Sequence, residues 1–410
     1  MKKIYFDHSA TTPADKAVVK KMLPFFNSRF GNPSSIHGFG QSAMTAVDEA
    51  RSEAAKFLNC KADEIVFTSG ATEANNLAFG GLIKGLQRKY KNQKFHIITS
   101  VIEHDSVLKP FAELERNGTE VTYIPVKPNG VVDSEVIRSA IKSNTVLVSI
   151  MYVNSEVGSI QPIKDIGKTI KKINEKKNKE WLNIEPDKRP DKPMTIFFHT
   201  DATQAANFLN CDVEFNYLDM LSLSGHKIYG PKGVGLLYVK KGVPVAALQL
   251  GGHHEGNRRS GTLNTPGIVG LGEALKRLDN KTVENNNNKI SKLRDQLVEG
   301  LKKKIPDIVL NTDRSNATPA HAHFSFVGIE GESILIALDL EGVAVSTGSA
   351  CASNSLKASH VLVAMGIKVE VSHSSIRFSL GKYNTKEEIK HLINILPPIV
   401  ARLRNISPQL

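Results

Sequence analysis

The sequence predicts an α/β protein in which helices cover a mostly parallel β-sheet. Short apolar runs alternate with helical stretches through the first two thirds of its 410 residues, and such alternation is typical of βαβ units. The most reactive side chains follow the ends of the apolar runs, where open α/β sheets place their ligands. A chain of this length can form two domains, each with its own core.

Four apolar runs are the clearest candidates for strands of this sheet, namely residues 64–68, 94–99, 145–151 and 195–198. The helix before the first run is marked by apolar residues that recur at spacings of three and four, namely Ala43, Val47, Ala50, Ala54 and Phe57. This spacing gives one apolar stripe and predicts a helix that packs on the sheet.

The pattern of apolar and charged residues changes after residue 262. A long, charged helical stretch leads to an apolar run over 321–327 and then to a second apolar run over 333–338. We interpret residues 13–262 as a large domain, and residues 1–12 with 263–410 as a smaller α+β domain. Within the large domain, residues 171–193 combine prolines with mixed charge, which predicts an exposed insertion. Whether this insertion docks a partner stays open.

Lys227 stands at the tip of a Ser-Gly-His turn between two apolar runs. Partial burial there favours the neutral amine, which can form a Schiff base with a carbonyl cofactor such as pyridoxal phosphate. Asp201 ends another apolar run, and its carboxylate can keep the ring nitrogen of that cofactor protonated. Residues 67–76 form a strand, a glycine turn and a helix start that suits a phosphate. The alternative interpretation of Lys227 is a surface lysine in a loop.

Eight segments together resemble the pyridoxal-phosphate cysteine desulfurases of the class V aminotransferase family, in particular the NifS and IscS group. They are residues 5–13, 30–35, 68–73, 199–204, 224–233, 259–262, 346–351 and 375–381. The segments around Lys227 and Cys351 are the specific ones. The resemblance implies fold type I of the pyridoxal-phosphate-dependent transferases, with a mostly parallel seven-stranded sheet and a smaller α+β domain. It also implies that sulfur is removed from L-cysteine, giving L-alanine and a persulfide on Cys351.

The resemblance also implies roles for the residues around the cofactor. Lys227 would hold the cofactor and move the substrate proton, and Asp201 would pair with the ring nitrogen. Gln204 would bind the ring hydroxyl, and His104 would stack on the ring and assist proton transfer. The residues implied at the phosphate are Ala71, Thr72, Ser224, His226 and, from the partner subunit of a homodimer, Thr262.

Two residues are implied at the substrate. Arg377 would clamp its carboxylate, a task that suits a planar two-donor fork, and Asn32 would lie near the mouth of the site. One position departs from the family pattern, because Ser155 stands where relatives commonly carry an asparagine that approaches the ring oxygen. Ser155, a bridging water and Asn154 stay open as the group that makes this contact.

Cys351 lies in a run of small polar residues, and we expect a mobile, exposed loop over about 345–356. Such a loop would let the thiolate take the sulfur and carry it outward. Cys60 and Cys211 are interpreted as packing residues. No Cys-x-x-Cys pair is present, so we expect a reducing compartment. We expect no resident metal, with Cys351 as a transient iron–sulfur ligand the one exception.

The formal net charge of +12 favours acidic partners or anionic ligands. Basic residues are interleaved with acidic ones, so we do not expect direct nucleic-acid binding. No apolar run is long enough for a membrane span, and the start of the chain does not have the pattern of a signal peptide. We therefore expect a cytoplasmic homodimer that acts on L-cysteine and passes its persulfide to an acceptor such as an iron–sulfur scaffold protein. The alternatives are a selenocysteine lyase, another class V enzyme, or a sulfur-binding protein that has lost catalysis.

Overall fold

A central β-sheet organises the larger part of the computed structural model, which describes residues 3–91, 93–189, 193–347 and 358–406. Within these ranges the sheet has seven strands in the order β2-β8-β7-β6-β5-β3-β4. The strands are β2 (Ile65–Thr68), β3 (His96–Ser100), β4 (Glu120–Ile124), β5 (Thr145–Ser149), β6 (Phe197–Asp201), β7 (Met220–Ser224) and β8 (Gly235–Val239). The five strands from β7 to β4 are parallel, and β8 runs against both neighbours. The predicted α/β class is confirmed.

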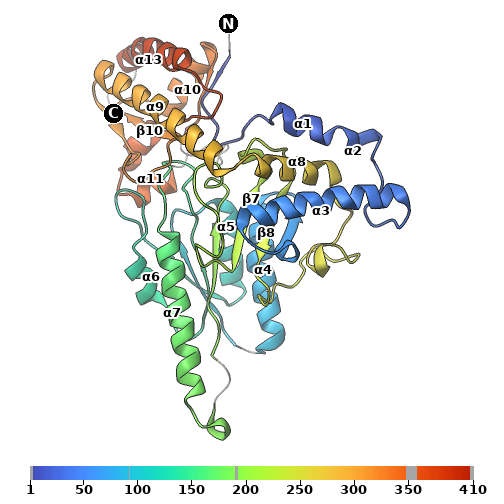
Figure 1. Ribbon diagram of the computed structural model, residues 1–410. Coiled ribbons are helices and arrows are strands. Elements are labelled where there is room, and N and C mark those ends of the chain that lie inside the picture. The colour runs from blue at the N-terminus through green and yellow to red at the C-terminus, as the bar shows by residue number, and fades with distance from the viewer. Residues whose placement is uncertain (1–2, 92, 190–192, 348–357, 407–410) are drawn as a thin grey trace.

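Helices cover both faces of this sheet (Figure 1). One face carries α4 (Ala71–Lys89) and α5 (Asp105–Arg116); the other carries α3 (Gly38–Leu58), α6 (Ser134–Ala140), α7 (Ile163–Leu182) and α8 (Thr265–Lys276), with α1 (Lys16–Met22) and α2 (Pro24–Asn27) against α8. Strand β2 shows why both faces are covered, because Ile65 and Phe67 lie in one core and Val66 in the other. The predicted helix before this strand is confirmed as α3. No helix in the described ranges has the length and apolar character of a membrane span.

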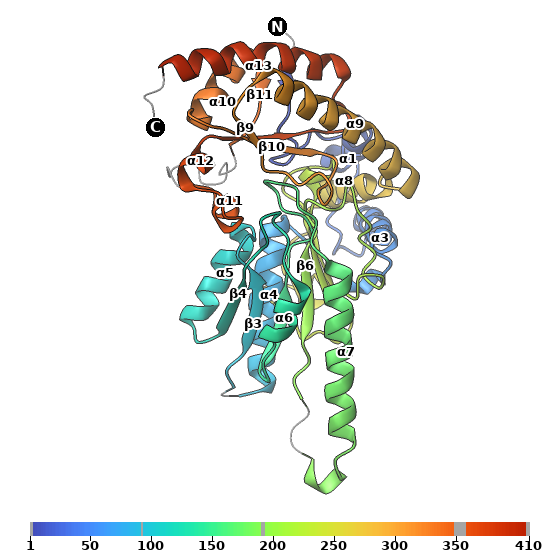
Figure 2. The same ribbon diagram turned by 90° about the vertical axis from the view of Figure 1, so that its left-hand side faces the viewer.

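A second layer of structure lies above the sheet in Figures 1 and 2. Its antiparallel sheet has the order β12-β10-β9, and β1 pairs in parallel with β11. The strands are β1 (Ile4–Tyr5), β9 (Ile308–Leu310), β10 (His321–Phe326), β11 (Val343–Ala344) and β12 (Ser375–Ser379); the helices are α9 (Asn280–Lys304), α10 (Gly331–Leu340), α11 (His360–Ala364), α12 (Val369–His373) and α13 (Lys386–Ile406). Short 3₁₀ turns are η1 (Ala62–Glu64), η2 (Pro186–Lys188), η3 (Gly225–Lys227) and η4 (Glu255–Asn257). The first strand of the chain thus joins elements that come after residue 300.

Helix α8 packs with the large sheet, although the predicted boundary at residue 262 assigns it to the smaller domain. Its Ile268, Leu271 and Leu275 lie in the core beneath α3, whereas α9 contributes Leu297 to the second core. This packing favours a boundary between α8 and α9. The division into domains itself stays a prediction.

The predicted insertion over 171–193 coincides with a protruding part of the molecule. Helix α7 is buried only through its first turns, and then runs past the sheet to the turn η2, far from the other elements (Figures 1 and 2). Near this tip, Leu182 and Ile184 are 57% and 37% exposed. Residues 190–192 lie outside the described ranges.

Candidate active site

A pocket of about 600 Å³ opens at the carboxyl ends of the parallel strands. It receives side chains from the ends of β6 and β7, the start of α4, the turn η3 and strand β12. The predicted site residues that line it are Ala71, Thr72, His104, Ser155, Asp201, Gln204, Ser224, His226, Lys227 and Arg377. Cys351 lies outside the described residues. Residues that are far apart in the sequence therefore share one pocket.

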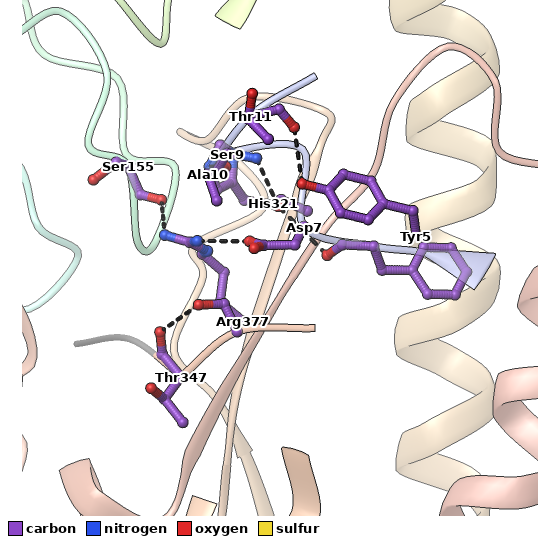
Figure 3. A network of polar contacts seen from close by, with 12 residues as sticks. Tyr5, Asp7, Ser9, Ala10, Thr11, Ser155, His321, Thr347 and Arg377 are labelled. Carbon is purple, nitrogen blue, oxygen red and sulfur yellow. Dashed lines mark hydrogen bonds and ion pairs between the residues drawn. The ribbon is translucent and has the colours of Figure 1, made fainter. Parts of the chain in front are cut away.

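Lys227 lies in this pocket rather than in bulk solvent, because two backbone carbonyls hold its side chain. Its Nζ donates to the carbonyl of Ala10 at 2.8 Å and to that of Ser9. Gln204 Nε2 also donates to Ser9, at 2.9 Å, and the Ser9 hydroxyl contacts His321 Nε2 at 2.8 Å (Figure 3). Sequence reasoning missed Ser9 and Ala10. The signal was the family segment 5–13, but a contact through backbone carbonyls leaves no mark in the side-chain types.

A chain of hydrogen bonds connects Asp201 to His104. Asn75 Nδ2 donates to Asp201 Oδ2 at 2.8 Å and to Ser106 Oγ at 2.9 Å, and the N–H of Thr203 donates to Asp201 Oδ1 at 2.9 Å. The backbone N–H of Ser106 donates to His104 Nδ1 at 3.0 Å. Because Nδ1 accepts this bond, the proton of a neutral His104 ring sits on Nε2. Asn75 and Ser106 were not among the predicted site residues.

The start of α4 offers the pocket unpaired backbone donors. The first helical bond runs from Ala74 N to Gly70 O at 3.1 Å, so the N–H groups of residues 71–73 have no acceptor inside the helix. Gly70 has φ of 154° and makes no side-chain cap, and this conformation requires glycine. The N-terminus of a 19-residue helix attracts anions.

His226 lines the same pocket as a neutral imidazole. Burial, reinforced by the nearby charges of Lys227 and Lys232, lowers its pKa to about 4. Its Nδ1 lies 3.1 Å from the hydroxyl of Thr11. At neutral pH this ring can therefore give a hydrogen bond to an anion without adding a charge.

Arg377 is held at both ends of its guanidinium (Figure 3). Nη1 donates to the carbonyl of Ser155 at 3.0 Å, and Nη2 pairs with Asp7 Oδ1 at 2.8 Å. Its Nε is buried and has no hydrogen-bond partner within the described ranges. A buried guanidinium fixed in this way presents one orientation to a carboxylate. Asp7, in the family segment 5–13, was not predicted to belong to the site.

Asn154 does not line the pocket, although we predicted it at the cofactor. Its Nδ2 donates to the carbonyl of Ile102 at 3.1 Å, and its Oδ1 accepts from the N–H groups of Glu156 and Val157 at 2.9 and 3.1 Å. The amide therefore shapes its own loop. Of the two neighbours, Ser155 is the one that faces the pocket.

Asn32 and Thr262 also lie away from the pocket of their own chain. Both are exposed, and Asn32 Oδ1 accepts from the N–H of Ser34 at 3.0 Å. Ser34 in turn contacts His254 Nε2 at 3.2 Å. His254 Nδ1 accepts from the N–H of Gly261 at 3.3 Å, so the loops of Asn32 and Thr262 lie next to each other.

Glu103 is a buried carboxyl directly before His104. Its Oε1 accepts from the Ser100 hydroxyl at 2.6 Å and from the N–H of Met151 at 2.9 Å. Burial raises the pKa of Glu103 to about 8. At neutral pH the folded protein therefore keeps this proton, and the unfolded chain loses it.

We expect the difference in unfolding free energy between Glu103→Gln and the wild type to depend on pH. Because the pKa is higher in the folded state, the wild type loses stability as pH rises from about 4.5 to about 8. Glutamine keeps an acceptor oxygen but does not titrate, so the difference should change by a few kcal/mol in its favour over this range. Urea unfolding at pH 5 and pH 8 measures it, with Glu49→Gln on the surface of α3 as control. The raised pKa of Glu103 would be contradicted if the unfolding free energies of Glu103→Gln and of the wild type changed equally between pH 5 and pH 8.

Comparison with known proteins gives one family for nearly the whole chain. The family model described as Aminotransferase class-V matches residues 4–176 and 191–392. The gap between the two matched ranges includes the last part of α7 and the turn η2. The main body of the chain therefore follows the family pattern, and the protrusion departs from it.

Three individual proteins show the same similarity. The chain is 44% identical over 407 residues to cysteine desulfurase IscS of Dictyoglomus turgidum, covering 99% of this chain and 97% of that protein. A solved NifS-like protein is 35% identical with a TM-score of 0.87, covering 98% of this chain and 100% of that one. The structure of SspA in complex with cysteine is 35% identical with a TM-score of 0.78, covering 94% and 100%.

Proposed function

Since the chain belongs to the class-V aminotransferase family and, within it, to the cysteine desulfurases, we propose that its pocket uses pyridoxal phosphate to remove sulfur from L-cysteine. The fold is the type I fold of pyridoxal-phosphate enzymes. One observation carries the assignment of residues: Lys227, Asp201 and Arg377 come from three distant segments and line one pocket. The relative named SspA, solved in complex with cysteine, supports the choice of substrate.

The residues of the pocket fit the cofactor. Lys227 would hold its aldehyde carbon, Asp201 would face its ring nitrogen, and the start of α4 would bind its phosphate together with Ser224 and His226. Thr203 has a buried hydroxyl without a partner among the described residues, which suits a polar ligand. When bound, pyridoxal phosphate supplies an electron-accepting ring.

The protein's own groups then handle the protons and orient the ring. The Lys227 amine would move the proton at the α-carbon of the substrate, and His104 would stack on the ring and assist through Nε2. Gln204 and Ser155 would bind the ring hydroxyl from the two sides of the pocket. The backbone carbonyls of Ser9 and Ala10 receive the lysine when it carries a proton.

Arg377 and Cys351 would act on opposite ends of the substrate. Arg377, whose guanidinium is held by Ser155 and Asp7, would bind the carboxylate. The Cys351 thiolate attacks the substrate sulfur; an S–S bond forms as the bond between Cβ and sulfur breaks, and the electron pair stays with the carbon. Protonation of that carbon yields alanine, and Cys351 keeps a persulfide.

We further propose a homodimer that shares its two sites. Large apolar side chains are exposed over residues 23–39 and at 248 and 250, namely Leu23, Phe26, Phe30, Ile36, Phe39, Leu248 and Leu250. Monomers rarely expose so much apolar surface. Thr262 is exposed close by and does not line its own pocket, which supports a role at the partner's phosphate. An iron–sulfur scaffold protein is the proposed persulfide acceptor, and the charge of +12 suits an acidic partner. A cytoplasmic location stays a prediction.

The function is tested by the products. We expect purified protein with pyridoxal phosphate, L-cysteine and a reductant to release alanine and sulfide in equal amounts. An aminotransferase would give a keto acid instead, and a selenocysteine lyase would turn over only L-selenocysteine. A yellow, cofactor-loaded preparation that forms no alanine would contradict the proposal.

A further inference from the structure

Two described residues, Ser346 and Ser359, come before and after Cys351 in the sequence and are held by hydrogen bonds. Before it, Ser346 pairs with the backbone of Arg377, whose N–H donates to Ser346 at 2.7 Å. After it, Ser359 begins helix α11 and is only 4% exposed. The first of these residues is part of the strand pair that carries the substrate arginine. No role was predicted for Ser359.

The hydroxyl of Ser359 is directed at a buried carboxyl. Its oxygen accepts from the N–H of Leu362 at 3.2 Å, as a helix cap, and its own N–H donates to the Ser372 hydroxyl at 3.1 Å. The single hydroxyl proton goes to Glu156 Oε2. Because a serine hydroxyl has only one proton, the Ser359 side chain donates to Glu156 and to no other group.

Glu156 belongs to the loop that forms one wall of the pocket. Its neighbour Ser155 lines the pocket and accepts the hydrogen bond from Arg377. Glu156 is 7% exposed, and burial raises its pKa to about 7, against the opposing effects of Ser359 and Arg377. A buried carboxyl is costly unless its hydrogen bonds are made. The contact with Ser359 therefore matters to both partners.

Apolar packing holds α11 against the same wall. Val361 and Leu362 of α11, and Met365 directly after it, form one cluster with Ile102, Met151 and Val157. His360 Nε2 also donates to the carbonyl of Glu103 at 3.0 Å. The helix that follows Cys351 is thus docked beside the pocket by packing and oriented there by polar contacts.

We propose that Glu156 is a positioning residue for sulfur transfer, and that its hydrogen bond with Ser359 fixes the start of α11 beside the loop that holds Arg377. Glu156 acts through Ser359 and does not touch the substrate. The inference rests on the proposed function, because it requires Cys351 to receive the sulfur. It predicts that loss of this bond slows the transfer step but leaves the binding of cysteine intact.

A double-mutant cycle tests the proposal in the full-length, cofactor-loaded protein. Glu156→Ala and Ser359→Ala should each lower kcat for alanine about tenfold, since the hydrogen bond between the Ser359 hydroxyl and a buried carboxyl is lost. KM for L-cysteine, and the absorbance change when cysteine binds, should stay within twofold. The double variant should be no slower than either single one. Glu156→Gln keeps an acceptor for Ser359 and should recover most of kcat.

Glu64→Ala is the matched control for the removal of a buried carboxyl. Glu64 is 8% exposed and accepts from the N–H groups of Lys61 and Lys241 at 2.9 and 2.8 Å, at the opposite end of β2 from the pocket. It should lower Tm without lowering kcat per folded molecule. The proposal is overturned if the two single effects multiply in the double variant, if KM rises while kcat holds, or if kcat stays within twofold. Failure of the proposed function is distinguishable, because the wild type would then form no alanine.

Discussion

The Lys227→Ala variant should lose alanine formation by about 10⁴-fold, because one amine both holds the cofactor and moves the substrate proton. The visible absorption band of the cofactor–lysine bond should disappear at the same time. The rate of alanine release and an absorption spectrum of the dialysed protein measure the two effects.

This loss should not come from unfolding. The Lys227 Nζ donates to the carbonyls of Ser9 and Ala10, and both residues line the pocket, where water can replace Nζ. Tm should therefore change little. A small primary amine such as ethylamine should restore a part of the activity, because it fits the space that the side chain leaves. A variant that keeps more than a tenth of its turnover would remove Lys227 from the mechanism.

The second large effect is expected for Cys351→Ser. We expect alanine formation to fall by about 10³-fold, because a serine hydroxyl is far less ionised than a thiol and cannot take sulfur as a persulfide. Cysteine should still bind and still change the absorbance of the cofactor, since Lys227 and Arg377 are untouched. Mass spectrometry of protein quenched during turnover should show one added sulfur in the wild type and none in the variant.

The two other cysteines provide the controls. Burial raises the pKa of Cys60 and that of Cys211 to about 12, so neither is a thiolate at neutral pH. Cys60→Ser and Cys211→Ser should keep the wild-type rate per folded molecule, although the second change places a hydroxyl in the core. Added sulfur found on Cys211 would show that the predicted acceptor is wrong.

The sequence predicted those features that depend on local pattern. Apolar runs and helical spacing located β2 and α3, because the alternation of strand residues and the helical stripe are set by geometry within a few residues. The predicted site residues at the ends of β6 and β7 line one pocket. The end of a parallel strand is where such a fold opens to a ligand, so position along the chain carried the information.

Contacts through the backbone and across long distances were not predictable in this way. The carbonyls of Ser9 and Ala10 could belong to any residue type, and Asp7 meets Arg377 only because Asp7, just after β1, pairs with Ser379 of β12. Asn154 and Ser155 point in different directions, and residue spacing in a loop does not tell which one faces the pocket. The place of α8 was missed for a similar reason, because its partner α3 lies more than two hundred residues earlier.

The pairing of the first strand with a late one has a consequence for how the protein is made. Ile4 pairs with Val343. The segment that carries Ser9 and Ala10 therefore cannot reach its final place until most of the chain has been translated. At 5–20 residues per second, that delay is roughly half a minute. The nascent chain therefore contains Lys227 well before the pairing of β1 brings the carbonyls of Ser9 and Ala10 into place. Sulfur chemistry has to wait until synthesis is nearly finished.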